Sequence, residues 1–227
     1  MLSYFRSLLK TFHPQGIPWP GTVLYNALSK SRVFQYHYEL VAKDILTYAP
    51  GGRLLDIGTG PGRLLLKLAE YSKQLQLAGL DISAAMVSRA KANIKRAGLG
   101  GKIDIREGAA EKLPFADGFF DVVVSTGTVH HWKHPGACLD DIHRVLKTGG
   151  WALLYDLVRR TPRKIRQEFS WKCGRTRTTL FWLHSFEEPF YSEEAFRSLA
   201  AGSSFTVRDE KFVGLFYCMA LKKNQNC

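Results

Sequence analysis

Apolar runs alternate with amphipathic segments along most of the chain. From residue 34 to residue 48 the apolar and aromatic side chains recur with helical spacing, and Pro50-Gly51-Gly52 ends that segment. The largely apolar run 54–57 that follows is typical of a strand buried on both faces of a parallel sheet. The same reading predicts further strands at 75–81, 102–106, 122–125, 151–157, 204–208 and 212–221, and helices at 63–71, 84–97, 140–146 and 192–201. The pattern therefore predicts an α/β fold.

Length and composition fit one folded domain with extensions. The chain has 227 residues, of which 45% are hydrophobic and 23% charged, so it can bury a sizeable core. We expect the domain at 51–227, with a basic insertion at about 159–191, and a helical extension at 1–50. Residues 1–12 of that extension predict a short basic amphipathic helix. Such a helix either docks on the protein's own core, covers the substrate or a partner, or lies on a membrane surface.

The sequence shows no targeting signal, which favours the cytoplasm. No apolar run approaches the roughly 20 residues needed to span a bilayer, and the N-terminus lacks the apolar core and cleavage site of a signal peptide. We therefore expect a cytoplasmic protein, with peripheral membrane contact through residues 1–12 as an open alternative. The four cysteines form no C-x-x-C pair, which predicts neither a zinc site nor a disulfide framework; they are Cys138, Cys173, Cys218 and Cys227.

A strong positive charge points to an acidic partner. The net charge is +12 and the isoelectric point is about 9.6, which suits nucleic acid, anionic lipid or an anionic small molecule. One stretch concentrates this charge, with eight basic residues against the single acid Glu168. These are Arg159, Arg160, Arg163, Lys164, Arg166, Lys172, Arg175 and Arg177. A solvated face explains such a run equally well.

A glycine-rich turn follows the first predicted strand and opens a helix. Glycines 58, 60 and 62 allow positive φ there, and the first amides of the helix provide donors for an oxygen-bearing group. The dinucleotide fingerprint G-x-G-x-x-G would place its third glycine at Arg63, which argues against NAD or FAD. The pattern Asp56-x-Gly58-x-Gly60-x-Gly62 instead resembles the cofactor-binding turn of class I S-adenosylmethionine-dependent methyltransferases.

A second acid ends the next predicted strand. Asp81 lies 25 residues after Asp56, at the carboxyl end of the neighbouring strand, where a carboxylate can accept hydrogen bonds from both ribose hydroxyls of an adenosine group. Capping of the following helix is the alternative role, with Ser83 as the rival cap. With Asp81 on the ribose, Ile82 would lie against the adenine, and Met86 would close the same pocket.

The segment 108–121 carries the third motif. Its sequence GAAEKLPFADGFFD resembles the adenine-binding loop G-D-A-E-x-L-P-F, followed by F-D-x-V, of the same methyltransferases. Ala109 replaces the acid that accepts from the adenine amino group in that pattern, which removes one contact worth about 1–2 kcal/mol. Glu111 or a water could substitute, and the amide of Ala110 remains available for a ring nitrogen.

Together the motifs cover about residues 52–155. The resemblance implies a Rossmann-like, seven-stranded, mostly parallel sheet with helices on both faces and an antiparallel last strand. It also implies S-adenosyl-L-methionine as the cofactor, held by Asp56, Gly58, Thr59, Gly60, Asp81, Ile82, Met86, Ala109, Ala110 and Thr126. We expect no metal, because the spacing of His130 and His134 lacks a third ligand and is interrupted by Pro135.

Histidines after the fourth predicted strand are the candidates for catalysis. This place lines the methionine end of the cofactor and the substrate entrance in the family that the chain resembles. His131 is the first candidate for a base or a substrate-orienting group, and His130 is the second.

The resemblance implies methyl transfer to a small-molecule or lipid-like acceptor, which the basic charge suggests is anionic. An RNA methyltransferase is an alternative, although residues 125–128 (STGT) lack the Asn/Asp-Pro-Pro-Tyr/Phe signature of enzymes that methylate exocyclic base amines. A non-catalytic cofactor-binding accessory protein is a third reading, prompted by Ala109.

Overall fold

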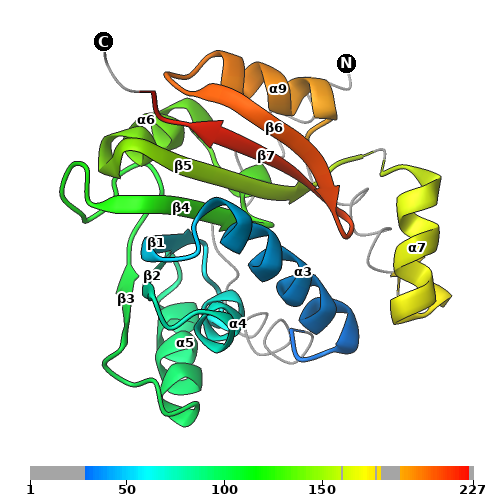
Figure 1. Ribbon diagram of the computed structural model, residues 1–227, viewed down its shortest axis with the longest axis horizontal. Helices are drawn as coiled ribbons and strands as arrows, with labels where there is room; N and C mark the ends of the chain where they lie inside the picture. The colour runs from blue at the N-terminus through cyan, green and yellow to red at the C-terminus, as the bar shows by residue number, and fades with distance from the viewer. Residues whose placement is uncertain (1–28, 160, 177, 180–189, 225–227) are drawn as a thin grey trace.

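A single sheet of seven strands forms the centre of the molecule (Figure 1). The computed structural model describes residues 29–159, 161–176, 178–179 and 190–224. The strand order is β3-β2-β1-β4-β5-β7-β6. The strands are β1 (Gly52–Ile57), β2 (Leu75–Asp81), β3 (Ile103–Glu107), β4 (Phe120–Thr126), β5 (Leu146–Leu157), β6 (Thr206–Val213) and β7 (Phe216–Lys222). Neighbours from β3 to β5 run parallel, while β7 is antiparallel to both β5 and β6. The predicted α/β class and antiparallel last strand are confirmed.

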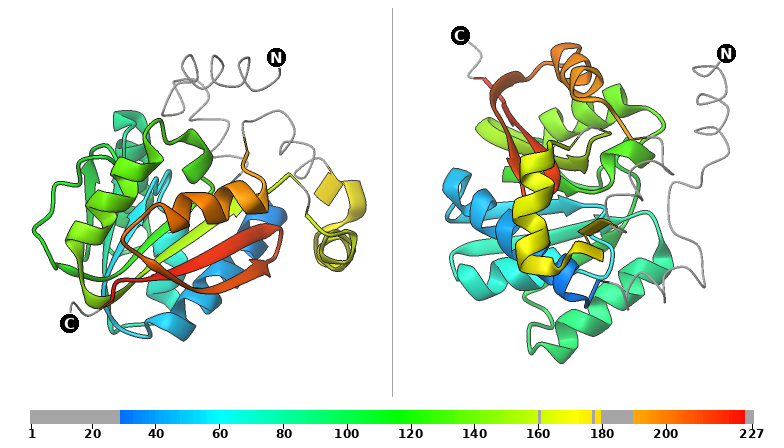
Figure 2. Two further views of the ribbon diagram at one scale, coloured as in Figure 1. Left: turned by 90° about the horizontal axis from the view of Figure 1, so that it is seen from above. Right: turned by 90° about the vertical axis from the view of Figure 1, so that its right-hand side faces the viewer.

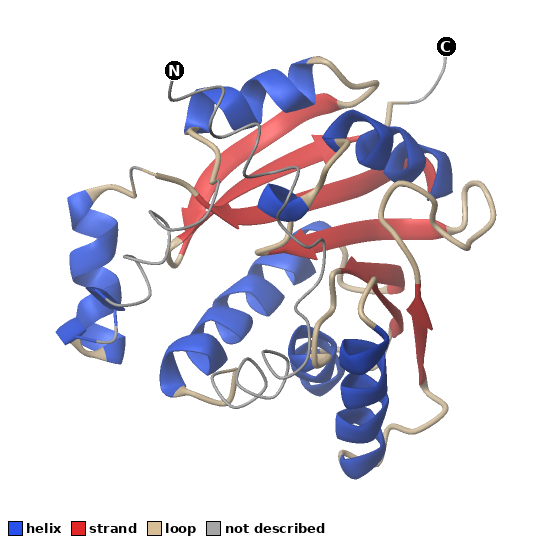
Figure 3. Ribbon diagram, turned by 180° about the vertical axis from the view of Figure 1, so that it is seen from behind, coloured by secondary structure: helices blue, strands red, loops and turns tan. Residues whose placement is uncertain are grey.

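Helices cover both faces of the sheet (Figure 3). They are α3 (Arg32–Tyr48), α4 (Arg63–Tyr71), α5 (Ala84–Arg96), η1 (Val129–His131), α6 (Pro135–Val145), α7 (Arg163–Cys173) and α9 (Glu193–Ala201). Apolar residues of α3, α4 and α5 form one hydrophobic cluster with one face of the strands, and those of α6 and α9 form a second cluster with the other face. In β1, Leu54 belongs to the first cluster and Leu55 to the second, and both are fully buried. This explains why the run 54–57 is almost uniformly apolar.

Helix α3 is an integral part of the fold. Val41, Ala42 and Ile45 are fully buried against the sheet. The hydroxyl of Tyr155 in β5 donates to the carboxylate of Asp44 over 2.8 Å, which fixes the helix to the central strands. The predicted extension 1–50 therefore contributes its last helix to the core, while residues 1–12, and the amphipathic helix predicted there, lie outside the described residues.

Several predicted boundaries are wrong, among them the start of α6, which begins at Pro135 and not at residue 140. Residues 147–150 lie between the predicted helix 140–146 and the predicted strand 151–157, yet they belong to β5, because Gly149 and Gly150 exchange backbone hydrogen bonds with Lys223. β6 (Thr206–Val213) extends beyond the predicted strand 204–208, and β7 (Phe216–Lys222) starts later than the predicted strand 212–221. The turn that connects them lies at Gly214 (φ 61°). β6 is the edge strand of the sheet, and six of its eight residues are polar or half-exposed aliphatic ones that give little apolar signal.

Helix α7 stands apart from the two layers, at the end of the molecule toward which β5 runs (Figures 1 and 2). It forms most of the described part of the predicted insertion. Its contact with the rest of the fold runs through Phe169, whose ring lies 4.6 Å from that of His37 and 5.4 Å from that of Tyr36 in α3. Among the described helices, none is both long enough and apolar enough to cross a membrane.

Candidate functional site at the carboxyl ends of the strands

The glycine turn between β1 and α4 is tightly packed. Gly58 has φ 72°, and a Cβ atom there would overlap the side chain of Thr128, so only glycine fits. The amides of Gly58 and Thr59 both donate to the carbonyl of Leu80, at 2.8 and 3.0 Å. The turn therefore lies directly against the end of β2. The amides of the first turn of α4 follow it, and they have no intrahelical acceptor.

The carboxylate of Asp81 joins this turn to the loop before α5. It accepts from the amide of Gly60 at 2.8 Å and from the amide of Ser83 at 2.9 Å. The side chain is 8% exposed, and burial raises its pKa. Ser83 rather than Asp81 caps α5, since its hydroxyl accepts from the amide of Met86 at 3.4 Å. Each carboxylate oxygen of Asp81 retains a lone pair that a ligand hydroxyl could use.

Asp56 lies beneath the turn and is 2% exposed. Burial raises the pKa of this carboxyl to about 7, and the nearby charge of Asp81 adds to that shift. Two acids thus end neighbouring strands, and they interact electrostatically. Perturbed carboxyl groups of this kind cluster at functional sites.

Apolar groups flank the two acids. Ile82 is 37% exposed at the very end of β2, whereas Met86 is buried in the first turn of α5. Gly108 donates to the carbonyl of Asp81 at 3.0 Å, so the loop that follows β3 starts beside the same strand end. Ala109 and Ala110 of that loop are half-buried. The structure therefore brings the second and third predicted motifs together.

Arg144 of α6 holds the loop that begins at Gly108. Its guanidinium donates to the carbonyls of Leu113 and Phe115 at 3.0 and 2.9 Å, and forms ion pairs with Asp141 and Asp117, both at 2.7 Å. Sequence reasoning missed both Arg144 and Asp141. An i, i+3 pair on a helix is ordinary at the surface, so no signal in the sequence distinguished it.

The end of β4 lies beside the end of β1. The hydroxyl of Thr128 is hydrogen bonded to that of Ser125 and donates to the carbonyl of Ile57 at 3.3 Å. Thr126 is half-buried, and its buried hydroxyl finds no hydrogen-bond partner among the described residues. A buried hydroxyl without a partner at a strand end is a candidate for binding a ligand.

His130 forms a buried pair with Asp156 of β5. Its Nδ1 lies 2.9 Å from one carboxylate oxygen and 3.0 Å from the other, and its backbone amide donates to the same group at 3.0 Å. His130 is 5% exposed and Asp156 is 1% exposed. Because a carboxylate only accepts, Nδ1 carries the proton, which leaves Nε2 to act as an acceptor.

The second predicted histidine lies beside this pair. The ring centroids of His130 and His131 are 3.9 Å apart, and Phe190 lies on His130 at 4.1 Å. His131 is half-buried. The contacts with Asp156 hold His130, the second candidate from the sequence, in one orientation. Asp156 was missed, although it ends its strand as Asp56 and Asp81 end theirs.

The residues present fit an adenosine-bearing cofactor with a charged amino-acid tail. Asp81 provides acceptors for ribose hydroxyls, Ile82 an exposed apolar surface for a base, and Thr126 an unpaired hydroxyl. The first turn of α4 provides amides for a carboxylate. The assignment of each residue to a cofactor contact stays a prediction.

Comparison with known proteins identifies the central segment. Residues 55–154 match the family model described as a methyltransferase domain. The chain is 31% identical over 119 residues to a ubiquinone/menaquinone biosynthesis C-methyltransferase of Geotalea daltonii, which covers 52% of this chain and 50% of the relative. It is 34% identical over 122 residues to 24-methylenesterol C-methyltransferase 2 of Oryza sativa, covering 54% and 33%. The matches thus span about half, or less, of the length of these relatives.

Solved structures share the fold over most of the chain. A protein of Methanococcus maripaludis, provisionally described as an S-adenosyl-L-methionine-dependent methyltransferase, superposes with a TM-score of 0.74 at 24% identity and covers 94% of this chain and 96% of its own. The [4+2]-cyclase SpnF superposes with a TM-score of 0.64 at 18% identity, covering 83% and 82%. Since the second is described by a different reaction, the fold alone does not fix the chemistry.

Proposed function

We propose that this chain, whose residues 55–154 match the methyltransferase-domain model, transfers a methyl group from S-adenosylmethionine to a small-molecule or lipid-like acceptor. The observation that carries the proposal is the carboxylate of Asp81, bound to the glycine turn at the carboxyl edge of the matched domain. In this proposal Asp81 binds the ribose hydroxyls, Ile82 contacts the adenine, and the first turn of α4 binds the carboxylate of the methionine part.

The protein's part in the reaction is alignment and proton removal. When bound, the cofactor supplies a methyl group on a positively charged sulfur that a nucleophile can displace in line. An acceptor oxygen or ring carbon must lose a proton when it gains the methyl group. His130 is the residue best prepared to take it, since Asp156 fixes the proton on Nδ1 and stabilises the charge that forms on the ring.

The class of acceptor is inferred from two observations. Relatives that match the chain are named for methylation of carbon in quinone biosynthesis and in sterols, which are both apolar ring compounds. The fourth strand ends in Ser125 and Thr126, with no proline-rich base-binding signature after it. RNA therefore stays the second candidate, and its support is the net charge of +12.

The proposal is tested first by calorimetric titration with S-adenosyl-L-methionine and then by transfer of a labelled methyl group. The acceptor probes are a reduced prenylated naphthoquinone, a sterol and unfractionated RNA. We expect micromolar cofactor binding, about −8 kcal/mol, and transfer to one of the two apolar acceptors. Absence of cofactor binding, or transfer to RNA alone, contradicts the proposal.

Variants separate the role of His130 from a structural one. His130→Gln and Asp156→Asn should lower the turnover rate about 100-fold or more without changing cofactor affinity by more than about twofold. His134→Gln changes an exposed histidine of the same segment and is the matched control. If His130→Gln and Asp156→Asn turn over as fast as the control His134→Gln, His130 has no part in the mechanism.

A further inference from the structure

Helix α7 exposes a tryptophan almost completely. Trp171 is 89% exposed, whereas Trp132 is 6% exposed and Trp151 is half-buried and packed against Tyr48. Exposing the apolar indole ring to water is unfavourable in free energy. Tryptophan is enriched where an apolar environment meets a polar one, as at a membrane interface. Trp171 therefore offers its indole ring for contact at the surface of α7.

Basic residues surround this tryptophan. Between residues 163 and 175 there are five cations and one acid, Glu168. The cations are Arg163, Lys164, Arg166, Lys172 and Arg175. A tryptophan on a helix rich in lysine and arginine is the composition of an element that lies in the interface of an anionic membrane.

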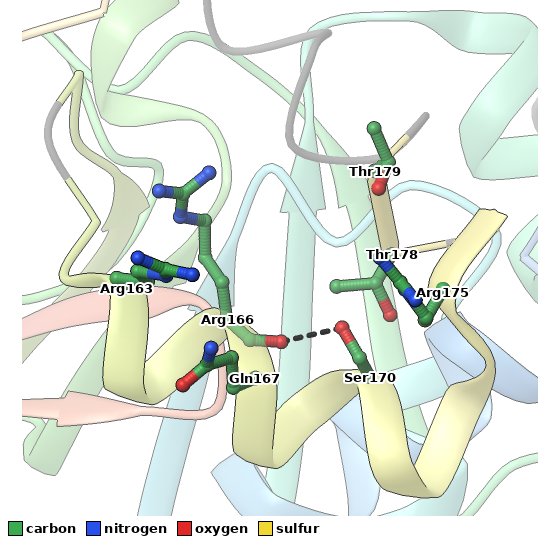
Figure 4. A pocket seen from close by; sticks show the side chains of 7 residues that line it. All are labelled: Arg163, Arg166, Gln167, Ser170, Arg175, Thr178 and Thr179. Carbon is green, nitrogen blue, oxygen red and sulfur yellow. Dashed lines mark hydrogen bonds between the residues drawn. The ribbon is translucent and has the colours of Figure 1, made fainter.

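Three of the arginines line a cavity beside the helix (Figure 4). Its volume is about 230 Å³, and Arg163 and Arg166 enter it from one side while Arg175 lies on the other. The hydroxyls of Ser170 and Thr178 also face it, but each donates to a backbone carbonyl. No acid is among the described residues that line the cavity. Guanidinium groups carry only donors, and their planar shape suits the oxygens of a phosphate.

The cavity and the tryptophan lie on adjacent sides of α7. Phe169 and Cys173 are buried and face α3. At 100° per residue, Trp171 points almost directly away from that buried face, and the cavity residues, spaced at 163, 166, 167 and 170, lie between the two. Helix α7 itself stands at one end of the molecule (Figure 2).

We propose that α7 is a membrane-contact element, in which Trp171 enters the boundary between headgroups and acyl chains and the arginine cavity binds the phosphate of an anionic phospholipid. The inference rests on α7 itself and holds whether or not the proposed methyl transfer does. It places a membrane contact on the insertion, whereas the sequence offered such a contact for residues 1–12 as one alternative. The carboxyl ends of the strands, with the candidate site, lie toward the same end of the molecule (Figure 1).

Vesicle flotation tests the proposal. The full chain is mixed with vesicles of equal parts phosphatidylglycerol and phosphatidylcholine, or of phosphatidylcholine alone. We expect binding to the anionic vesicles, weakened about fivefold for each arginine removed in the double variant Arg163→Gln and Arg175→Gln. The matched control, Lys91→Gln with Lys95→Gln, removes the same charge from exposed positions of α5 and should bind within about twofold of the parent.

Fluorescence reports the position of the tryptophan. On addition of anionic vesicles the emission should shift to shorter wavelength, and Trp171→Phe should abolish most of that shift while keeping the fold. Three results would overturn the proposal: equal weakening by the α5 control, loss of binding only on deletion of residues 1–12, or tighter binding to RNA or to free inorganic phosphate than to the vesicles. Cofactor titration of the same variants should be unchanged, which separates this test from that of methyl transfer.

Discussion

Replacing Asp81 by asparagine tests the centre of the candidate site. The two carboxylate oxygens accept from Gly60 and Ser83 at 2.8 and 2.9 Å, and so hold the turn and the α5 loop together. Asparagine keeps the size and one acceptor, but its amide group would face the second backbone N–H. One charge-assisted hydrogen bond is then lost, and a donor is left without a partner.

The expected effects differ for stability and for binding. Loss of a hydrogen bond to a charged group costs about 1.5–3 kcal/mol. Since burial raises the pKa of Asp81, its charge also carries a desolvation cost that asparagine removes, so the net loss of stability should be nearer 1–2 kcal/mol. Binding of ribose hydroxyls has no such offset, and the affinity for S-adenosyl-L-methionine should fall about 10- to 150-fold.

Urea unfolding and calorimetric titration measure the two effects separately. Glu107→Gln is the matched control, because Glu107 pairs in register with Asp81 on the neighbouring strand and is exposed. It should change neither quantity appreciably. The ribose assignment fails if Asp81→Asn binds the cofactor within about twofold of the parent, or if Glu107→Gln weakens binding equally.

Two further predictions concern residues outside the cofactor contacts. Arg144→Gln should cost about 2–3 kcal/mol in the free energy of unfolding and increase hydrogen exchange in residues 113–117, whereas unchanged exchange there would contradict its role in holding the loop. His37 is buried, and burial lowers its pKa to about 3, so the unfolded chain takes up a proton below pH 6.5 that the native protein refuses. The contribution of His37 to the free energy of unfolding should therefore fall as pH drops from about 6.5, by up to about 1.4 kcal/mol per unit, and it is measured as the difference between the parent and His37→Gln in urea unfolding at pH 5 and pH 7.

Strong local signals explain the elements that were predicted well. The bounds of α4 (Arg63–Tyr71) and β2 (Leu75–Asp81) agree with the prediction, since a glycine turn starts the helix and an apolar run ending in an acid defines the strand. The elements that were predicted wrongly depend on hydrogen bonds to residues far away in the sequence. Residues 147–150 are strand only because Lys223, some 70 positions later, bonds to them, and no local pattern reports such a partner.

The same distinction applies to the candidate site. Asp56 and Asp81 were found because each follows an apolar strand and precedes a turn, and the parallel order of β1 and β2 then places them at one edge. Asp156 ends β5 in a similar way, but it was read as part of that strand. Its contact with His130 depends on the register of β4 and β5, in which Thr126 pairs with Tyr155. The position of Asp156 near the end of its strand was visible in the sequence. Its contact with His130 was not predictable without the order of the strands in the sheet.

Two buried groups make opposing contributions to the dependence of stability on pH. Burial raises the pKa of Asp56 to about 7, so the native protein keeps a proton that the unfolded chain releases above about pH 4. The stability that this group contributes is lost as pH rises toward 7, whereas that of His37 is gained over much of the same range. A flat profile for the parent protein is therefore compatible with a large effect of each group. Only the difference between the parent and His37→Gln isolates the histidine, because Asp56 contributes equally to both.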